Sequence, residues 1–329
     1  RAVTHEDYVG WVLTHLTRKV KMTPQNDRIL PGIVLMLGFC ITAPLIDVAS
    51  KLAAQSLPVG QITTARFIVQ AAIMAPLCLI LHYPLTFPRA YLWQLAQRAF
   101  FLVASTYCFV AALQVMPIAD ALAIVFVEPF ILLILGRFLF QDEVGPRRIM
   151  ACVVGFAGSL LVIQPSLVAF GFIALYPLGT ALFFAAYMLV TRSLSRRMHP
   201  IPMQLHTASV AALMCLPVML LADGSGVVTL DPVMPVGLDW IWMCGVGVAS
   251  SIAHLMMTYA LRMAPTSTLA PLHYLEIVSA VAFGYLVFSD FPDALTWVGI
   301  AIIVASGLYI IWRERITATP PIAPRPSVH

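Results

Sequence analysis

Two acidic side chains lie inside long apolar runs. Glu128 lies in "FVEPFILLILGRFLFQDE" (residues 126–143), and Glu276 lies in "YLEIVSAVAFGYLVFSD" (274–290). A carboxylate at the centre of a bilayer costs about 3 kcal/mol on insertion scales, so it should face protein or water and have a partner. Each residue could be a proton- or substrate-responsive acid that lines a cavity. The alternative is a structural carboxyl that bonds to neighbouring backbone, near the kink that Pro129 introduces.

Two histidines lie on helical faces that carry other polar groups. His254 has Ser250 four residues before it and Thr258 four residues after it, so the three form one polar stripe. His273 precedes Glu276 by three residues and shares its helical face. A histidine suits proton coupling or recognition of a carboxylate because its charge changes near neutral pH. The alternative for each histidine is an ordinary buried packing residue.

Asp47 and Arg66 are a candidate structural charge pair. By helix rise, Arg66 lies about 10 Å below one membrane surface, and Asp47 lies at a similar depth, four residues before Lys51. A pair between Asp47 and Arg66 would neutralise both charges, as would a pair between Asp47 and Lys51 one helical turn away. We favour the structural pair Asp47–Arg66 over an anion-binding role for Arg66.

The aromatic and sulfur-containing residues give weaker signals. Four tyrosines in the apolar segments are candidates for cavity walls, with packing as the alternative: Tyr107, Tyr187, Tyr259 and Tyr274. The six cysteines are scattered singly, without a Cys-x-x-Cys or Cys/His spacing. This pattern indicates small buried hydrophobes rather than metal ligands or disulfides. We therefore expect no metal and no cofactor.

The elements that must position these residues are membrane helices. Of the 329 residues, 60% are hydrophobic and 10% are charged, whereas a soluble domain carries about 25% charged residues. A spanning helix needs about 20 apolar residues. Ten such segments can be laid out: 30–50, 59–82, 90–114, 117–140, 147–164, 169–191, 201–222, 236–262, 265–289 and 295–312. The sequence therefore predicts an all-α membrane protein with ten transmembrane helices and no nucleic-acid partner.

The positive charges orient these helices. If the N-terminus is cytoplasmic and the ten segments alternate, all 19 Lys and Arg residues except Lys51 and Arg66 fall on the cytoplasmic side. This is the partition that the positive-inside rule describes, and adding or dropping one segment would scramble it. Both termini are therefore predicted to be cytoplasmic, with residues 1–28 and 316–329 as tails.

The two glutamate runs belong to an internal repeat. Residues of distinctive type recur 148 positions apart: Pro117 and Pro265, Glu128 and Glu276, Gly136 and Gly284, Asp142 and Asp290. The runs fall in the fourth and ninth segments, an odd number apart, so the two copies are expected to point in opposite directions. Inverted repeats of five helices are typical of secondary transporters, whose substrate site lies near the midplane. By helix rise, each glutamate lies roughly 16 Å into a core about 30 Å thick.

The residues of this repeat resemble a known family. "FVEPFILLILGRFLFQDEVGPRRIMACVVGFAGSLLVI" is similar to the signature half of an EamA domain of the drug/metabolite transporter superfamily, which has Glu-Pro at the centre of a helix, an acidic loop and a Gly-rich helix. "YLEIVSAVAFGYLVFSDFPDALTWVGIAIIVASGLYII" resembles the second copy, with Ile277 in place of the proline. "TTARFIVQAAIMAPL" resembles the family's Arg-Phe helix, at Arg66 and Phe67. The resemblance implies two EamA-like repeats, residues 29–166 and 167–315, and is nearest to the amino-acid and metabolite exporters of bacterial inner membranes.

The repeat and the resemblance favour a secondary transporter over other functions. An intramembrane enzyme would need a nucleophile with a base or a metal set, and the sequence has no HExxH, GxGD or GxSG pattern. A channel would need an oligomeric pore or a repeated filter sequence, and neither is visible. We predict a transporter, not an enzyme, that exports amino acids or related small metabolites across the inner membrane by alternating access. Its expected partners are a small-molecule substrate, the lipid bilayer and protons, and efflux of drugs or organic cations is the alternative function.

Overall fold

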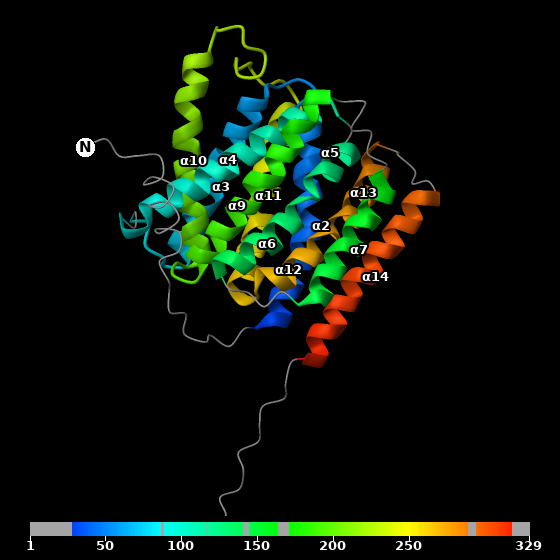
Figure 1. The fold of residues 1–329 in the computed structure, drawn as a ribbon. Helices are drawn as coiled ribbons and strands as arrows, with labels where there is room; N and C mark the ends of the chain where they lie inside the picture. The colour runs from blue at the N-terminus through cyan, green and yellow to red at the C-terminus, as the bar shows by residue number, and fades with distance from the viewer. Residues whose placement is uncertain are drawn as a thin grey trace, which may run out of the picture.

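The computed structural model describes residues 28–86, 89–116, 118–140, 145–163, 171–288 and 294–317, and every regular element within them is a helix. The first half contains α2 (Ile29–Ala53), α3 (Val59–Ile80), η1 (Arg89–Tyr91), α4 (Leu92–Leu113), α5 (Ile118–Val125), α6 (Glu128–Phe140) and α7 (Pro146–Ile163). The second half contains η2 (Gly171–Ala174), α9 (Leu175–Ser195), α10 (Pro200–Ala222), α11 (Asp239–Met263), α12 (Thr266–His273), α13 (Glu276–Phe288) and α14 (Ala294–Thr317). Figure 1 shows these helices packed into one bundle.

The described helices fall on the ten predicted segments, which confirms the all-α membrane fold. Seven of the described helical stretches are long and apolar enough to cross a membrane. Residues 118–140, 146–163 and 294–317 complete the ten segments. The predicted tails, apart from Arg28 and residues 316–317, lie outside the described residues, as do Pro117, Asp142 and Asp290 of the sequence repeat.

Two segments that were expected to be continuous helices, 117–140 and 265–289, are broken. Short turns directly before Glu128 and Glu276 divide them into α5 and α6, and into α12 and α13. At each break an amide reaches back three residues instead of four, from Val127 to Ile124 (3.2 Å) and from Leu275 to Leu272 (3.0 Å). This is the tighter geometry of a 3₁₀ turn. Each glutamate is thereby the first residue of a new helix.

A proline accounts for the first break but not for the second. Pro129 has no amide hydrogen, and a proline ring clashes with the carbonyl four residues earlier, so it removes one helical hydrogen bond and favours a kink or break at this point. In the second copy Ile277 stands at this position, and its amide bonds to the carbonyl of Tyr274 at 3.2 Å. Pro129 cannot make the equivalent bond to Phe126, whose carbonyl instead accepts the hydroxyl of Tyr274 at 3.2 Å. The second break therefore occurs without a proline at the equivalent position, although Pro271 lies earlier in α12.

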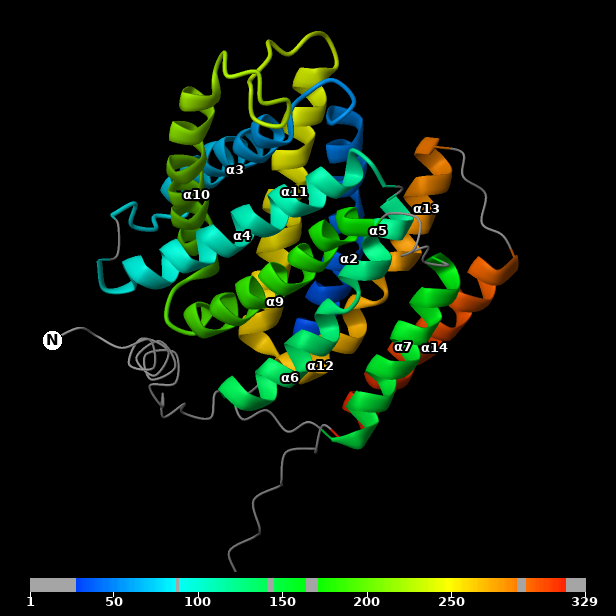
Figure 2. The same ribbon diagram turned by 45° about the horizontal axis from the view of Figure 1, so that its top comes forward.

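The last three helices of each half recur 148 positions apart, the same offset as the repeat in the sequence. The bounds of α5 and α12, and those of α6 and α13, differ by 148 positions at both ends, and α7 and α14 begin 148 positions apart. The helices α7 and α14 lie side by side (Figure 2). Ser306 bonds to the carbonyl of Ala151 at 3.0 Å, whereas Gly158, further along α7, faces Ile303, which is earlier in α14. The two equivalent helices are therefore antiparallel.

Helix pairs across the two halves form the core. The closest packed pairs are α2 with α11, α4 with α9, α3 with α10 and α7 with α14. Each pair joins one segment of the first half to one of the second: first to third, third to first, second to second, and fifth to fifth. This set is unchanged when the halves are exchanged, which is the pattern of two structurally equivalent repeats around a common axis. Space between the repeats is therefore bounded by both of them.

Candidate functional site

A cavity between the repeats collects most of the ionisable candidates. Its empty space is about 730 Å³, counting the part that opens outward. The aromatic part of its wall consists of Phe39, Phe109, Phe126 and Phe184. Its ionisable residues are Asp47, Arg66, Glu128, His254, His273 and Glu276. A mostly apolar pocket with a few convergent polar groups is typical of a small-molecule site.

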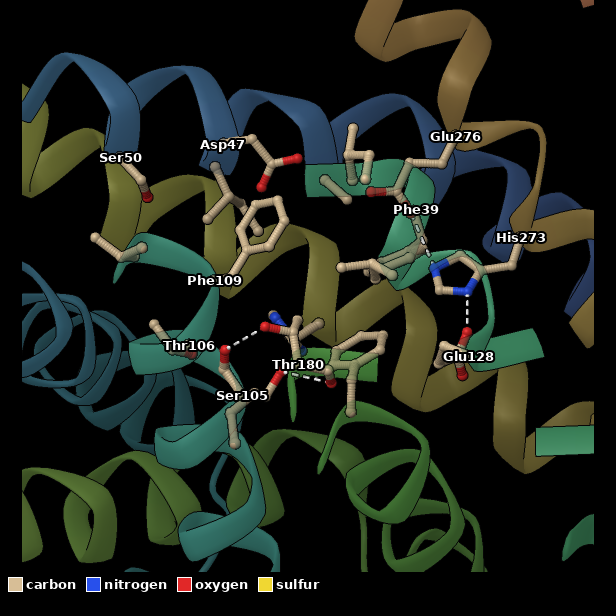
Figure 3. Close-up of a pocket in the computed structure, with 18 of the residues that line it drawn as sticks. Phe39, Asp47, Ser50, Ser105, Thr106, Phe109, Glu128, Thr180, His273 and Glu276 are labelled. Carbon is tan, nitrogen blue, oxygen red and sulfur yellow. Dashed lines mark hydrogen bonds and ion pairs between the residues drawn. The ribbon is translucent and has the colours of Figure 1, made fainter. Parts of the chain in front are cut away.

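Glu128, His273 and Glu276 form one hydrogen-bonded cluster, with the ring of His273 between the two carboxyl groups (Figure 3). Oε2 of Glu128 lies 2.7 Å from Nδ1 of His273, and Oε2 of Glu276 lies 2.9 Å from Nε2. All three side chains are buried, Glu128 with 0% exposure. The helix breaks create this arrangement, because each glutamate begins a helix and His273 ends α12. The predicted neighbour of Glu276 is thus also the partner of Glu128 from the other repeat.

Two arrangements of hydrogens can satisfy the contacts of the cluster. Each of its two contacts needs a hydrogen, which a doubly protonated ring supplies to both carboxylates, or a neutral ring and one protonated carboxyl supply together. Either arrangement holds two hydrogens and a net charge of −1. Oε1 of Glu128 has no hydrogen-bond partner among the described residues. The carboxyl groups lie at opposite edges of the ring, so the three side chains cannot converge on one metal ion.

A second polar group in the same cavity is built on Arg66. Its Nη1 donates to Oγ1 of Thr106 at 2.6 Å, and its Nη2 lies 2.6 Å from Nε2 of His254. Arginine can only donate, so Nε2 of His254 must accept. The ring hydrogen is then on Nδ1, which lies 3.0 Å from the hydroxyl oxygen of Tyr187. His254 is therefore a neutral ring in a fixed tautomer, unlike His273.

The expected ion pair between Asp47 and Arg66 is not formed between these two described side chains. Arg66 donates to neutral acceptors on α4 and α11, which lie closer to its guanidinium than the carboxylate does. Oδ2 of Asp47 and Nε of Arg66 each lack a hydrogen-bond partner within the described part of the chain. Both residues nevertheless line the same cavity, which leaves the anion-binding alternative for Arg66 open.

The four candidate tyrosines do not line this cavity in the described structure. The hydroxyl of Tyr187 lies 3.0 Å from Nδ1 of His254, and the hydroxyl of Tyr274 bonds to the carbonyl of Phe126. Tyr107 donates to Thr229 in the loop between α10 and α11 (3.3 Å), and Tyr259 lies 3.5 Å from Nε2 of His199, the residue that precedes α10. Apolar packing and interactions at the helix ends thus account for Tyr107 and Tyr259.

The polar stripe around His254 is also divided. Thr258 donates to the carbonyl of His254 within α11 at 2.6 Å, and Oγ of Ser250 has no partner among the described residues. Of these three residues, only His254 belongs to the cavity wall.

Sequence reasoning missed Arg98. It was counted among the cytoplasmic surface charges, but the structure buries it completely, with 0% exposure. Its Nη2 donates to the hydroxyl oxygen of Tyr187 at 2.7 Å, so Tyr187 connects it to His254. The available signal was its position inside the apolar segment 90–114, where an arginine is unlike its neighbours. Ser105 and Thr180, which exchange hydrogen bonds of 3.4 Å in the cavity wall (Figure 3), had no comparable signal.

Comparison with known proteins finds similarity over most of the chain. The sequence profile of the EamA-like transporter family matches residues 30–164 and again residues 171–312. The riboflavin transporter of Rhizobium johnstonii is 28% identical over 233 residues, 71% of this chain and 72% of that protein. The S-adenosylmethionine uptake transporter of Rickettsia prowazekii is 24% identical over 88% of this chain and 96% of its own length. The pseudopaline exporter of Pseudomonas aeruginosa is 25% identical over 85% of this chain and 95% of its own length.

One solved crystal structure superposes with a TM-score of 0.69 and 18% identity, over 89% of this chain and 100% of the other. At that identity, the likeness shows the fold alone.

Proposed function

Because the chain belongs to the EamA-like transporter family, we propose that it is a secondary transporter for a zwitterionic, amino-acid-like metabolite in the bacterial inner membrane. The curated relatives are named as transporters of riboflavin, S-adenosylmethionine or pseudopaline, and their names include both uptake and export. We propose export by alternating access. The substrate class, the direction and the coupling to protons rest on the arguments that follow.

The observation that carries the substrate class is that residues lining one cavity carry unpartnered polar atoms of both signs. Arg66 offers Nε, while Asp47 and Glu128 offer Oδ2 and Oε1. A substrate carboxylate suits the guanidinium, and a substrate ammonium suits the carboxylates. The phenylalanines of the wall would contact the apolar part of such a molecule. A drug-like cation, the alternative substrate, would leave the donor of Arg66 unused.

We infer the direction from a proposed competition at Glu128. A substrate ammonium and a third proton would both be bound at its free oxygen, so one excludes the other. Mutually exclusive binding at a site with alternating access exchanges the two species across the membrane. An inward proton gradient, which bacterial inner membranes maintain, would then drive the substrate outward.

The arrangement of helices supports an inverted repeat, and the distribution of Lys and Arg along the sequence favours cytoplasmic termini. The helices α7 and α14 are equivalent and antiparallel, and both repeats break a helix at the depth of the glutamates. Discontinuous helices at a repeat interface are typical of transporter sites. Cysteines at exposed positions Thr86 and Ser225, in a Cys244→Ser background, test the orientation. We expect an impermeant maleimide to label Ser225→Cys from outside and Thr86→Cys only after permeabilisation, and the opposite result would refute it.

Transport in proteoliposomes tests the function. Vesicles are screened with labelled L-amino acids, riboflavin and tetraphenylphosphonium, under pH gradients of either sign. We expect at least one zwitterion to exchange against protons, with a rate that depends on pH. His273→Gln, Glu128→Gln and Glu276→Gln should each flatten that dependence, because each changes a hydrogen of the same cluster. Transport of tetraphenylphosphonium without any zwitterion would favour drug efflux instead.

A further inference from the structure

Arg98 is a buried cation without a carboxylate within ion-pair distance among the described residues. From α4 it donates to three other helices: Nε to Thr191 (2.8 Å), Nη1 to Thr207 (2.5 Å), and Nη2 to Tyr187 (2.7 Å), Gln204 (2.6 Å) and Thr258 (3.4 Å). Every acceptor is a neutral side-chain oxygen. Burying an ion without a counter-ion costs several kcal/mol, and ionisable groups inside membrane segments usually mark a transport path. The buried charge of Arg98 therefore favours the binding of an anion beside it.

Gln204 provides a second, independent sign of a missing anion. Its side chain is 0% exposed, and its Oε1 accepts from Arg98. Its Nε2 has no acceptor among the described residues, although a buried amide hydrogen without a partner costs about 1–3 kcal/mol. Two hydrogens of Nη2 also serve three acceptors, of which Thr258 at 3.4 Å is the weakest. The donors of Arg98 are thus all used by neutral acceptors, whereas the adjacent amide of Gln204 has hydrogens but no acceptor.

These residues lie beyond the cavity along the bundle. Arg98 precedes the cavity residue Ser105 by seven positions on α4, or about 10 Å of helix rise, and Thr191 follows Thr180 by about 16 Å on α9. Tyr187 and His254 connect Arg98 to Arg66 in an unbroken series of hydrogen bonds. In the proposed orientation, Arg98 lies on the cytoplasmic side of the cavity.

We propose that Arg98 and Gln204 form a second carboxylate site, which binds the substrate's carboxylate on the cytoplasmic side of the path. In the described conformation the hydroxyl groups of α9, α10 and α11 occupy the donors of Arg98, which holds these helices against α4. Separation of the helices would release the donors to a carboxylate, for which Gln204 supplies a further N–H. The proposal rests on the proposed function, because it assumes a substrate that carries a carboxylate.

Acetate, a carboxylate without a side chain, tests the site directly. The thermal unfolding of the purified protein in detergent is measured in sodium acetate and in sodium chloride of equal ionic strength. Ligands that bind only the folded state raise its stability, and two sites add their effects. We expect acetate to raise Tm of the wild type, Arg66→Met and Arg98→Met each to lose part of the shift, and the double variant to lose all of it.

Gln204→Glu is the sharper variant, because it fills the site with a carboxylate of the chain itself. We expect it to raise Tm in chloride, to reduce the acetate shift as Arg98→Met does, and to abolish proteoliposome transport. Ser209→Ala removes a hydroxyl group from the same helix outside the site, and it should change neither the acetate shift nor transport. The comparison of Gln204→Glu with Ser209→Ala still tests the second site if Arg98→Met does not fold.

The proposal would be overturned by no acetate shift in the wild type, by a full shift in Gln204→Glu, or by wild-type transport in Gln204→Glu. Loss of the whole shift in Arg66→Met alone would also overturn it, since one site would then suffice. If no zwitterion of the panel is transported by the wild type, the proposed function fails, whereas the acetate measurement still decides whether the second site exists.

Discussion

The hydroxyl of Tyr274 donates to the carbonyl oxygen of Phe126 at 3.2 Å, and these two residues are 148 positions apart, at the same place in the two repeats. Their rings also pack, with centroids 5.7 Å apart. Equivalent positions meet only close to the axis that relates two copies. The axis therefore passes through the two helix breaks. Glu128 and Glu276 follow these breaks directly, so duplication brings both acids to the same interior point.

Tyr274→Phe should destabilise the protein by about 1–3 kcal/mol, because it leaves the buried carbonyl of Phe126 without a donor. The free energy of unfolding in detergent measures this effect. Tyr176→Phe, at a tyrosine that is 43% exposed, is the matched control and should change stability by less than about 0.5 kcal/mol. Equal losses in the two variants would show that the bond at the axis contributes nothing specific.

Gly155 offers a second way to disturb the same contact. A Cβ atom there would lie 2.6 Å from Cδ2 of Tyr274, which is too close for van der Waals contact. Gly155→Ala should therefore displace the ring and reproduce the loss seen in Tyr274→Phe, and the two losses should not add when the variants are combined. Additive losses would mean that Gly155 acts elsewhere.

The helices and the repeat could be predicted from the sequence, but the partners of the glutamates could not. Apolar runs and charged breaks mark the helices because the bilayer requires them. The spacing of three residues likewise placed His273 beside Glu276. No local pattern connects Glu128 with His273, which lies 145 positions away and reaches it only through packing of α6 against α12.

Arg98 and Arg66 show the same limit for charges. An arginine six residues inside a helix resembles an interfacial residue, and only the neighbouring helices reveal that Arg98 is enclosed. Asp47 and Arg66 have similar predicted depths and opposite charges. Yet the guanidinium of Arg66 bonds to neutral groups of α4 and α11. Depth along the membrane can be read from sequence, whereas direction around each helix axis depends on tertiary packing.

Arg66→Met should fold and lose affinity for a carboxylate substrate. The variant removes a buried charge whose direct partners, Thr106 and His254, are neutral, so no countercharge is stranded in direct contact. A hydrogen bond to a charged group contributes about 1.5–3 kcal/mol. Its loss corresponds to a half-saturation constant that is roughly 10- to 100-fold higher. Adding Asp47→Asn should not increase the yield of folded protein. A clear increase would restore the structural pair of Asp47 and Arg66.

His199 should make stability depend on pH outside the membrane segments. It precedes α10 and stacks on Tyr83 with ring centroids 4.3 Å apart. Burial and then the charge of Arg262 hold the pKa of His199 below its ordinary value. The unfolded chain therefore binds a proton more readily than the folded one. The resulting contribution to stability is complete above about pH 6.5 and is lost as the pH falls through the lower pKa of the folded state.

His199→Asn tests this effect, because asparagine can still cap α10 but does not titrate. The difference in unfolding free energy between pH 7.5 and pH 5 should be smaller in the variant than in the wild type. Equal pH dependence in both proteins would assign the effect to other groups.

The two histidines of the cavity should respond oppositely to the same substitution. Nε2 of His254 accepts from Arg66, and Nδ1 faces the hydroxyl of Tyr187, so the ring uses one acceptor and one donor. A glutamine side chain also offers one acceptor and one donor. His254→Gln should therefore keep the half-saturation constant within about threefold of wild type. His254→Leu, which leaves Arg66 without that acceptor, should raise it roughly tenfold, as loss of about 1.4 kcal/mol implies. Neither variant should alter the pH profile of transport.

His273→Gln removes a group that both glutamates bond to and that can carry a proton. Glutamine can replace one donor and one acceptor there but cannot be protonated, so the variant should fold and transport with a flattened pH profile. The measurement is the initial rate of exchange in proteoliposomes between about pH 5.5 and 8.5, for wild type and the three variants together. A flattened profile in His254→Gln, or an unchanged one in His273→Gln, would contradict the division of roles between a fixed neutral ring beside Arg66 and a proton-binding ring between Glu128 and Glu276.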